Sequence, residues 1–83
     1  MKLRYFAWVR ERVGQAEEEI EVPGHVGNVA ELMTWLAARD EGYAAAFAEP
    51  DVIRAAIDQE HVDHSTPISG NSEIAFFPPM TGG

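Results

Sequence analysis

The sequence contains no cysteine. This excludes a disulfide framework, a thiolate metal site, an iron–sulfur cluster and a cysteine nucleophile, and it fits a reducing compartment. Long hydrophobic runs are also missing, because no segment approaches the roughly 20 apolar residues of a membrane-spanning helix. The N-terminal segment MKLRYFAWVRER carries charge throughout and has no apolar stretch like that of a signal peptide. We therefore expect a cytoplasmic protein.

Basic residues are scarce, because six Lys and Arg residues stand against fourteen Asp and Glu residues, for a formal net charge of −8. Nucleic acids and anionic membrane surfaces are bound through Lys and Arg, so this balance argues against both kinds of partner. It favours a protein partner with a basic docking surface, since opposite potentials speed the encounter of two proteins. A need for solubility alone would explain the charge equally well.

Recognisable catalytic motifs are missing as well. The chain has no serine with a base in a known motif, no phosphate-binding glycine loop and no paired-glycine fingerprint. The segment HVDH holds His61, Asp63 and His64, but a metal site needs a third defined ligand and supporting hydrogen bonds. We expect these side chains to be solvated in a polar loop, with no bound metal and no active site of the chain's own.

The pattern of apolar residues predicts a single α+β domain over residues 1–83, in which one main helix packs on a mixed sheet. Asn28 has the chemistry of a helix N-cap. After it, apolar residues recur with the spacing of an amphipathic helix, at Val29, Leu32, Met33 and Leu36.

Shorter elements surround this helix. Alternating apolar and polar residues predict strands at residues 2–8, 17–22, 51–57 and 73–77, with a further short strand at Val62. One helical turn is expected at residues 9–14, ending at Gly14, and a short helix at residues 43–47, after an interruption at Gly42. A turn is expected at residues 70–71.

Aromatic residues on the first and last strands give the first indication of function. If the first and last strands are neighbours, Ile74 and Phe76 point into the core. Phe77 then faces the side of the sheet that the helix leaves free, together with Phe6 and Trp8. An exposed apolar patch of this kind usually marks an interface, although a covering loop would also explain it.

The C-terminal end, PPMTGG, follows the last strand directly. Pro78 and Pro79 end the strand, because proline cannot donate to a sheet and stiffens the chain. Residues 80–83 would reach about 13 Å when extended, and two terminal glycines can enter a channel that is too narrow for side chains. The tail is therefore either simple disorder or a thin stalk that delivers the carboxylate of Gly83 to another protein.

Four segments resemble the small subunits of molybdopterin synthase, in the same order and spacing and over nearly the whole chain. They are FAWVRERVG at residues 6–14, VAELMTWLAAR at 29–39, IRAAIDQ at 53–59 and GNSEIAFFPPMTGG at 70–83. The ending FFPP-x-x-GG is specific, whereas Gly-Gly alone is a weak signal. The resemblance implies a β-grasp, ubiquitin-like fold. The chain departs from the family at Asp58, where members often have asparagine.

The resemblance also implies a sulfur carrier with no catalytic activity of its own. An E1-like enzyme uses ATP to adenylate Gly83, and sulfur then replaces one carboxylate oxygen. The thiocarboxylate donates this sulfur to cyclic pyranopterin monophosphate in the large subunit, which builds the dithiolene of molybdopterin. The carrier binds no cofactor, and the family's enzyme is a heterotetramer. The resemblance assigns tail threading to Met80, Thr81 and Gly82, and partner contact to Phe6, Arg10, Phe77, Pro78 and Pro79.

Three alternatives stay open. A sulfur carrier for another pathway, such as thiamin thiazole synthesis, would also end in Gly-Gly, although such carriers are usually shorter and lack FFPP. A ubiquitin-like modifier would form isopeptide bonds through Gly83. A plain β-grasp binding module would carry the tail incidentally.

Overall fold

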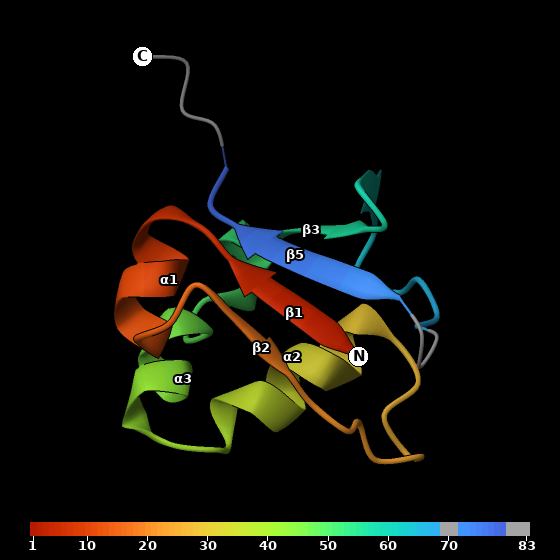
Figure 1. The fold of residues 1–83 in the computed structure, drawn as a ribbon, viewed down its shortest axis with the longest axis horizontal. Helices are drawn as coiled ribbons and strands as arrows, with labels where there is room; N and C mark the ends of the chain where they lie inside the picture. The colour runs from red at the N-terminus through yellow and green to blue at the C-terminus, as the bar shows by residue number, and fades with distance from the viewer. Residues whose placement is uncertain (69–71, 80–83) are drawn as a thin grey trace.

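The computed structural model describes residues 1–68 and 72–79. Its strands are β1 (Lys2–Tyr5), β2 (Glu17–Glu19), β3 (Arg54–Ile57), β4 (Glu60–Val62) and β5 (Glu73–Phe77). Its helices are α1 (Ala7–Val13), α2 (Val29–Ala37), α3 (Glu41–Ala46) and a 3₁₀ helix, η1 (Pro50–Val52). The strands form one mixed sheet in the order β2-β1-β5-β3-β4, and the helices lie against one side of it (Figure 1).

The main helix α2 forms where the sequence predicts it. The side chain of Asn28 accepts a hydrogen bond from the backbone N–H of Glu31 (2.8 Å), which satisfies one free donor of the first turn. The four apolar residues of the predicted stripe are all buried. Propensity and capping therefore agree with burial along this helix, and the predicted N-cap is confirmed.

The core lies between α2 and the central pair of strands, β1 and β5. These two strands run parallel, with Tyr5 opposite Phe76, so the predicted neighbourhood of the first and last strands is confirmed. Phe76 is fully buried, and its ring meets that of Phe47 edge-on at 5.2 Å between centroids. Such aromatic pairs add to the free energy that burial of their area provides. The first and last strands are thus held together in the middle of the sheet.

The first strand is shorter than the sequence predicts, because it ends at Tyr5. Phe6 is still extended, but Ala7 has a φ of 53° and turns the chain into α1. Trp8 therefore lies on α1, half-buried against the core and with the guanidinium of Arg12 over its ring at 4.3 Å. Its predicted place on the free side of the sheet is wrong. The predicted end of this helix is confirmed, since Gly14 adopts the left-handed conformation (φ 94°) that glycine tolerates.

Three other boundaries differ from the prediction. The second strand ends at Glu19, although Ile20 beyond it is still buried. The third begins only at Arg54, because residues 50–52 form η1, with a proline in its first turn, where a missing N–H costs nothing. Gly42 does not interrupt a helix but lies inside α3, which begins after the N-cap Asp40. The turn expected at residues 70–71 lies outside the described residues.

A tight hairpin joins β3 to the predicted short strand at Val62, which is confirmed as β4. Its two loop residues, Asp58 and Gln59, have φ values of 50° and 72°. Positive φ at both positions is typical of a type I′ turn, whose twist matches that of the two strands. Asn or Asp is favoured at the first of these positions. The carboxylate of Asp58 also accepts the backbone N–H of Glu73 (3.0 Å), which ties the turn to β5.

A cluster of polar side chains joins β1, β2 and α3. The carboxylate of Glu18, with 11% of its side chain exposed, accepts hydrogen bonds from the hydroxyls of Tyr5 (2.7 Å) and Tyr43 and from the guanidinium of Arg39 (3.0 Å). Every oxygen of this carboxylate therefore has a partner, which removes the usual cost of burying a charge. No helix within residues 1–68 and 72–79 has the length and apolar character needed to cross a membrane.

Candidate functional site

The predicted reactive residue, Gly83, lies outside the described residues, as do Met80, Thr81 and Gly82. The structure describes the surface from which this segment starts, at the end of β5. Here Phe77, Pro78 and Pro79 are half-buried. Because β5 lies between β1 and β3, it is hydrogen-bonded on both sides up to its last residues. The segment therefore starts from the central strand of the sheet, which is paired on both sides.

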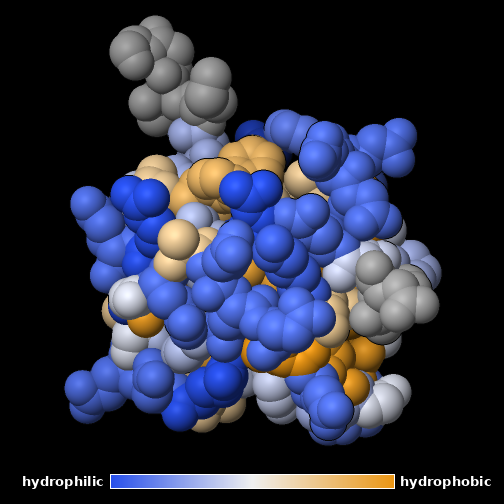
Figure 2. All heavy atoms as spheres, viewed as in Figure 1, coloured by the Kyte–Doolittle hydropathy of each residue, from blue (hydrophilic) through white to orange (hydrophobic). Residues whose placement is uncertain are grey.

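Phe6 lies beside this starting point. Its backbone N–H donates to the carbonyl of Phe76 (3.1 Å), which extends the β1–β5 ladder by one residue. Its ring is 40% exposed and lies 5.3 Å from the guanidinium of Arg4, whose side chain is on the side of the sheet away from the helices. Figure 2 shows a hydrophobic area next to the end of β5, bordered by strongly hydrophilic atoms. An exposed aromatic ring beside an apolar area is typical of surfaces that contact other proteins.

Phe77 lies on the same free face. It alternates along β5 with the fully buried Phe76, as the strand period requires. The ring of His61, which comes from β4, stands edge-on to that of Phe77 with 5.2 Å between centroids. Ala56 lies between Ala75 and His61 in the strand register and is only 5% exposed. Sequence reasoning missed His61 here, although its position two residues after the hairpin turn fixes its face.

Two arginines flank the aromatic pair formed by Phe6 and Phe77. Arg10 is exposed on α1, and Arg54 is exposed at the start of β3, directly opposite Phe77 in the sheet register. Neither forms an ion pair with the residues that the structure describes. By contrast, Arg4 lies within 3.4 Å of Glu73 and 3.9 Å of Glu17. The surface at the end of β5 therefore combines the exposed ring of Phe6 and the half-buried ring of Phe77 with positive charge, although the whole chain is strongly acidic.

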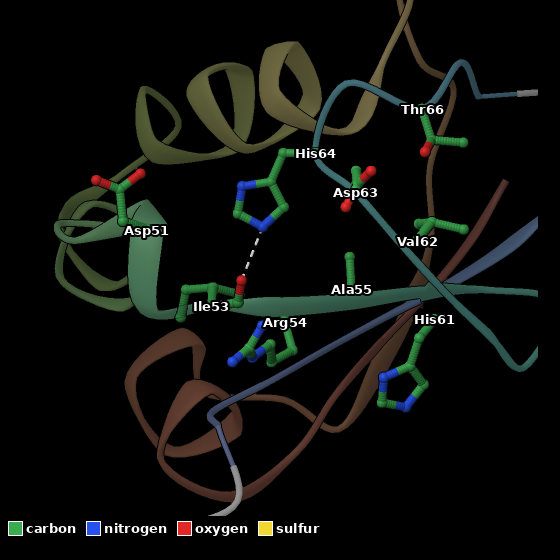
Figure 3. A pocket seen from close by; sticks show the side chains of 9 residues that line it. All are labelled: Asp51, Ile53, Arg54, Ala55, His61, Val62, Asp63, His64 and Thr66. Atoms are coloured by element: carbon green, nitrogen blue, oxygen red, sulfur yellow. Dashed lines mark hydrogen bonds between the residues drawn. The ribbon is translucent and has the colours of Figure 1, made fainter.

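An open pocket of about 700 Å³ runs along the first half of β3, beyond the end of β4 (Figure 3). His64 lies on one side of β3 and donates from Nε2 to the carbonyl of Ile53 (2.7 Å), whereas Arg54 and His61 point to the other side. The two histidines of the HVDH segment therefore do not converge. Within the described part of the chain, no three His, Asp or Glu side chains come together as metal ligands would.

The strongest electrostatic coupling among the described residues lies away from this surface, around Glu18. Burial alone would raise the pKa of this carboxyl, but the hydrogen bonds from Tyr43, Tyr5 and Arg39 outweigh it and hold the pKa below its usual range. Burial and the hydrogen bond to Glu18 raise the pKa of both tyrosines. The cluster thus holds the negative charge of Glu18 among fixed donors. Because these donors come from β1, from α3 and from the segment before α3, the cluster stabilises the packing of these elements.

Comparison with known proteins matches nearly the whole chain to one family and to a relative of the same length. Residues 3–83 match the model of the ThiS family. The chain is 36% identical over 83 residues to the molybdopterin synthase sulfur carrier subunit of Escherichia coli strain K12, and the match covers 100% of this chain and 99% of that protein.

Solved structures agree on the fold. A protein from Pyrococcus furiosus described as subunit 1 of a molybdopterin converting factor superposes with a TM-score of 0.75, at 26% identity and over 95% of each chain. SAMP1 from Haloferax volcanii superposes with a TM-score of 0.73, at 23% identity, over 100% of this chain and 98% of its own. Together with the observed sheet order, these matches confirm the predicted β-grasp fold.

One further structure shows a related fold in a complex. It contains subunits 1 and 2 of the molybdopterin-converting factor from Helicobacter pylori. The match has a TM-score of 0.64, at 22% identity, and covers 99% of this chain and 96% of that one. At this identity the likeness is evidence for the fold alone.

Proposed function

The chain belongs to the ThiS family, and from that premise we propose that it is the sulfur carrier subunit of a molybdopterin synthase. The observation that carries the proposal is the identity of 36% with a molybdopterin synthase sulfur carrier over the full length of both chains. The specific ending FFPP-x-x-GG supports it, because the prolines separate a folded strand from two residues that have no side chains.

In this function the chain supplies the atom that reacts, the terminal carboxyl carbon of Gly83. A carboxylate is a poor electrophile, so one of its oxygens first attacks the α-phosphate of ATP and pyrophosphate leaves. A sulfur donor then forms a C–S bond to that carbon, and AMP leaves with the oxygen. The chain has no cysteine, so it has no thiol that could carry the sulfur as a persulfide.

The thiocarboxylate then passes its sulfur to cyclic pyranopterin monophosphate, on the way to the dithiolene of molybdopterin. Activation of Gly83 and transfer of its sulfur require two other proteins. An E1-like enzyme supplies ATP-dependent activation, and a large subunit supplies the catalytic residues and the substrate pocket. The Escherichia coli relative is named as one subunit of a molybdopterin synthase, which supports a partner of the second kind. The chain itself has the role of a non-catalytic subunit in a cytoplasmic heterotetramer.

The fold supports delivery of the C-terminus. The carrier's last strand, β5, is the central strand of the sheet and is paired along its length with β1 and β3. A partner that grips the aromatic pair formed by Phe6 and Phe77 therefore holds the base of the tail at a fixed place. Precise positioning of a reacting group on a rigid element is what transfer between two active sites demands.

Intact-protein mass spectrometry tests the proposal. The chain is incubated with an E1-like activating enzyme, ATP and a sulfur donor, and its mass is followed with time. The proposal predicts the mass increase that corresponds to one oxygen replaced by sulfur, and no increase after deletion of Gly83. Covalent conjugates on lysines of other proteins would favour the ubiquitin-like modifier, and an unchanged mass would favour a plain binding module.

The same reaction separates the two sulfur-carrier functions. When the charged chain is mixed with a large subunit and the pterin precursor, a molybdopterin synthase carrier loses the added mass as the dithiolene product forms. A carrier of another pathway, such as thiamin synthesis, keeps its sulfur under these conditions.

A further inference from the structure

We propose that Arg54 and His61 form a cationic flank beside Phe77, in which Arg54 carries the charge and His61 adds a hydrogen-bond donor, and that the large subunit which receives the tail presents carboxylates to this flank. The inference rests on the proposed function and adds the chemistry of the surface that recognises the carrier. The two residues lie on the β3–β4 side of the free face, where the family resemblance assigns no site residue. The occupant is a protein surface that is apolar at its centre and acidic at this edge.

The sheet register places the two residues together. Arg54 is opposite Phe77, and His61 is opposite Ala56, two residues further along β3. Residues two apart on a strand share a face, so both side chains lie on the face of Phe77. Figure 3 shows Arg54 and His61 pointing to the same side of β3. The edge-on contact of His61 with Phe77, at 5.2 Å between centroids, holds the imidazole at the rim of the aromatic surface.

The charges at this rim are not balanced within the described residues. Arg54 is exposed and has no carboxylate within ion-pair distance there, and the same is true of Arg10 on the other side of the aromatic pair. The acidic groups of the free face are used elsewhere, because Glu73 pairs with Arg4, and Glu17 pairs with Lys2 and Arg4. Two of the chain's six basic residues are thus left to act outward at the base of the tail.

This local charge points to a different partner surface from the one expected from composition. The net charge of −8 suggests a partner with a basic docking surface. At distances beyond about 10 Å, however, salt screens exposed charges from one another, so the groups at the interface decide recognition in contact. At the end of β5 those groups are arginines, a histidine and aromatic rings. Enrichment in arginine and aromatic residues is typical of protein interfaces, and their rims carry the polar contacts.

The chemistry of the flank selects carboxylates. A guanidinium donates two parallel hydrogen bonds to a carboxylate, and an imidazole adds a donor beside it. Phosphates of a nucleic acid offer similar oxygens, but two side chains in a chain of this net charge cannot offset the repulsion from a polyanion. Continuity with Phe77 and the tail base places the acidic partner surface at the same docking event that admits the tail.

Binding of the full chain to the large subunit tests the inference, with affinity measured by isothermal titration calorimetry. Arg54→Ala should weaken binding about tenfold, because a charge-assisted hydrogen bond is lost. Arg54→Glu should weaken it further, and Arg54→Lys should lie between Arg54→Ala and the unchanged chain. The matched control is Ala44→Glu, which lowers the net charge by the same one unit as Arg54→Ala at an exposed position of α3. None of the three Arg54 variants should change thermal unfolding.

The outcomes separate this inference from the proposed function. Unchanged affinity of Arg54→Glu would overturn the cationic flank. A loss of affinity for Ala44→Glu equal to that for Arg54→Ala would also overturn it. So would weakened binding to the activating enzyme with unchanged binding to the large subunit. If the unchanged chain is charged with sulfur but does not bind the large subunit, the inference fails and sulfur carriage stands. Failure of charging itself would contradict the proposed function.

Discussion

The backbone N–H of Phe6 donates a hydrogen bond of 3.1 Å to the carbonyl of Phe76. This bond joins the point where β1 turns into α1 to the end of β5. Phe6, which follows β1, and Phe77, the last residue of β5, are therefore held close to this main-chain contact at the base of the tail. Because main-chain bonds of the central strands set this arrangement, it does not depend on the conformation of a loop.

Phe77 should matter more for partner binding than for folding. Phe77→Asp places a charge on the half-buried free face, so we expect a loss of large-subunit binding of at least tenfold with a modest change in thermal unfolding. The control is Phe76→Ala, which empties a fully buried site and should cost about 3–5 kcal/mol of unfolding free energy. Calorimetric binding and thermal unfolding measure both effects. Equal losses of binding and stability for Phe77→Asp would identify it as a core residue.

Glu18 should make the unfolding free energy depend on acid pH. Its pKa in the folded chain is lower than in the unfolded chain, so its contribution is fully present above the unfolded pKa and is lost as pH falls through the folded pKa. Glu18→Gln should lower stability at pH 7 by on the order of 2 kcal/mol, because several charge-assisted hydrogen bonds weaken. Urea unfolding from pH 7 to pH 3 should show the gap between the two proteins closing towards low pH. A gap independent of pH would contradict the role given to the ionised carboxylate.

Gln59→Gly should stabilise the β3–β4 hairpin. Gln59 holds a φ of 72°, a conformation that costs a residue with a side chain about 1–2 kcal/mol and glycine almost nothing. After the greater chain entropy of glycine is subtracted, we expect a gain of about 0.5–1 kcal/mol in the free energy of unfolding. Thermal unfolding of the single variant is sufficient, and a lower melting temperature would show that the side chain of Gln59 has a stabilising contact of its own.

Gly42→Ala should destabilise the chain, although alanine is the better helix former by about 1 kcal/mol. A Cβ at this position would lie 2.7 Å from the backbone carbonyl oxygen of Arg12, so α1 and α3 would have to move apart. Gly24→Ala is the matched control, because its Cβ would meet no atom within 4 Å. Chemical denaturation should show a loss for residue 42 alone. A gain there would mean that the two helices separate without cost.

The sequence predicts α2 and β5 well because several signals agree at each. For α2, the cap and the apolar period point to the same boundaries, and β5 lies between turn residues and two prolines. The predicted end of the first strand is wrong for a physical reason, because the strand pattern of residues 2–8 overlaps with the helical spacing that follows it. Trp8 and Arg12 are spaced as neighbours on a helix, and this period begins before the alternation ends.

The polar cluster around Glu18 was also missed, although one signal was present. In the run of three glutamates, Glu18 shares its parity with Ile20, so the same reasoning that turns Ile20 inward also turns Glu18 inward. Its partners, Tyr43 and Arg39, come from a distant part of the chain and could not be paired with it by local pattern. The local excess of positive charge at the end of β5 depends on the same kind of long-range pairing.

Sulfur transfer from Gly83 is tested most directly by a single turnover. The charged chain is mixed with the large subunit and cyclic pyranopterin monophosphate, and the mass of the chain and the formation of the dithiolene are followed together. Because each chain carries one sulfur and a dithiolene holds two, sulfur carriage predicts that two charged chains return to their carboxylate mass for each product formed. It also predicts no product from a variant with an extra residue after Gly83 that stays untrimmed. Product formation from that blocked variant would contradict the role of the terminal carboxylate.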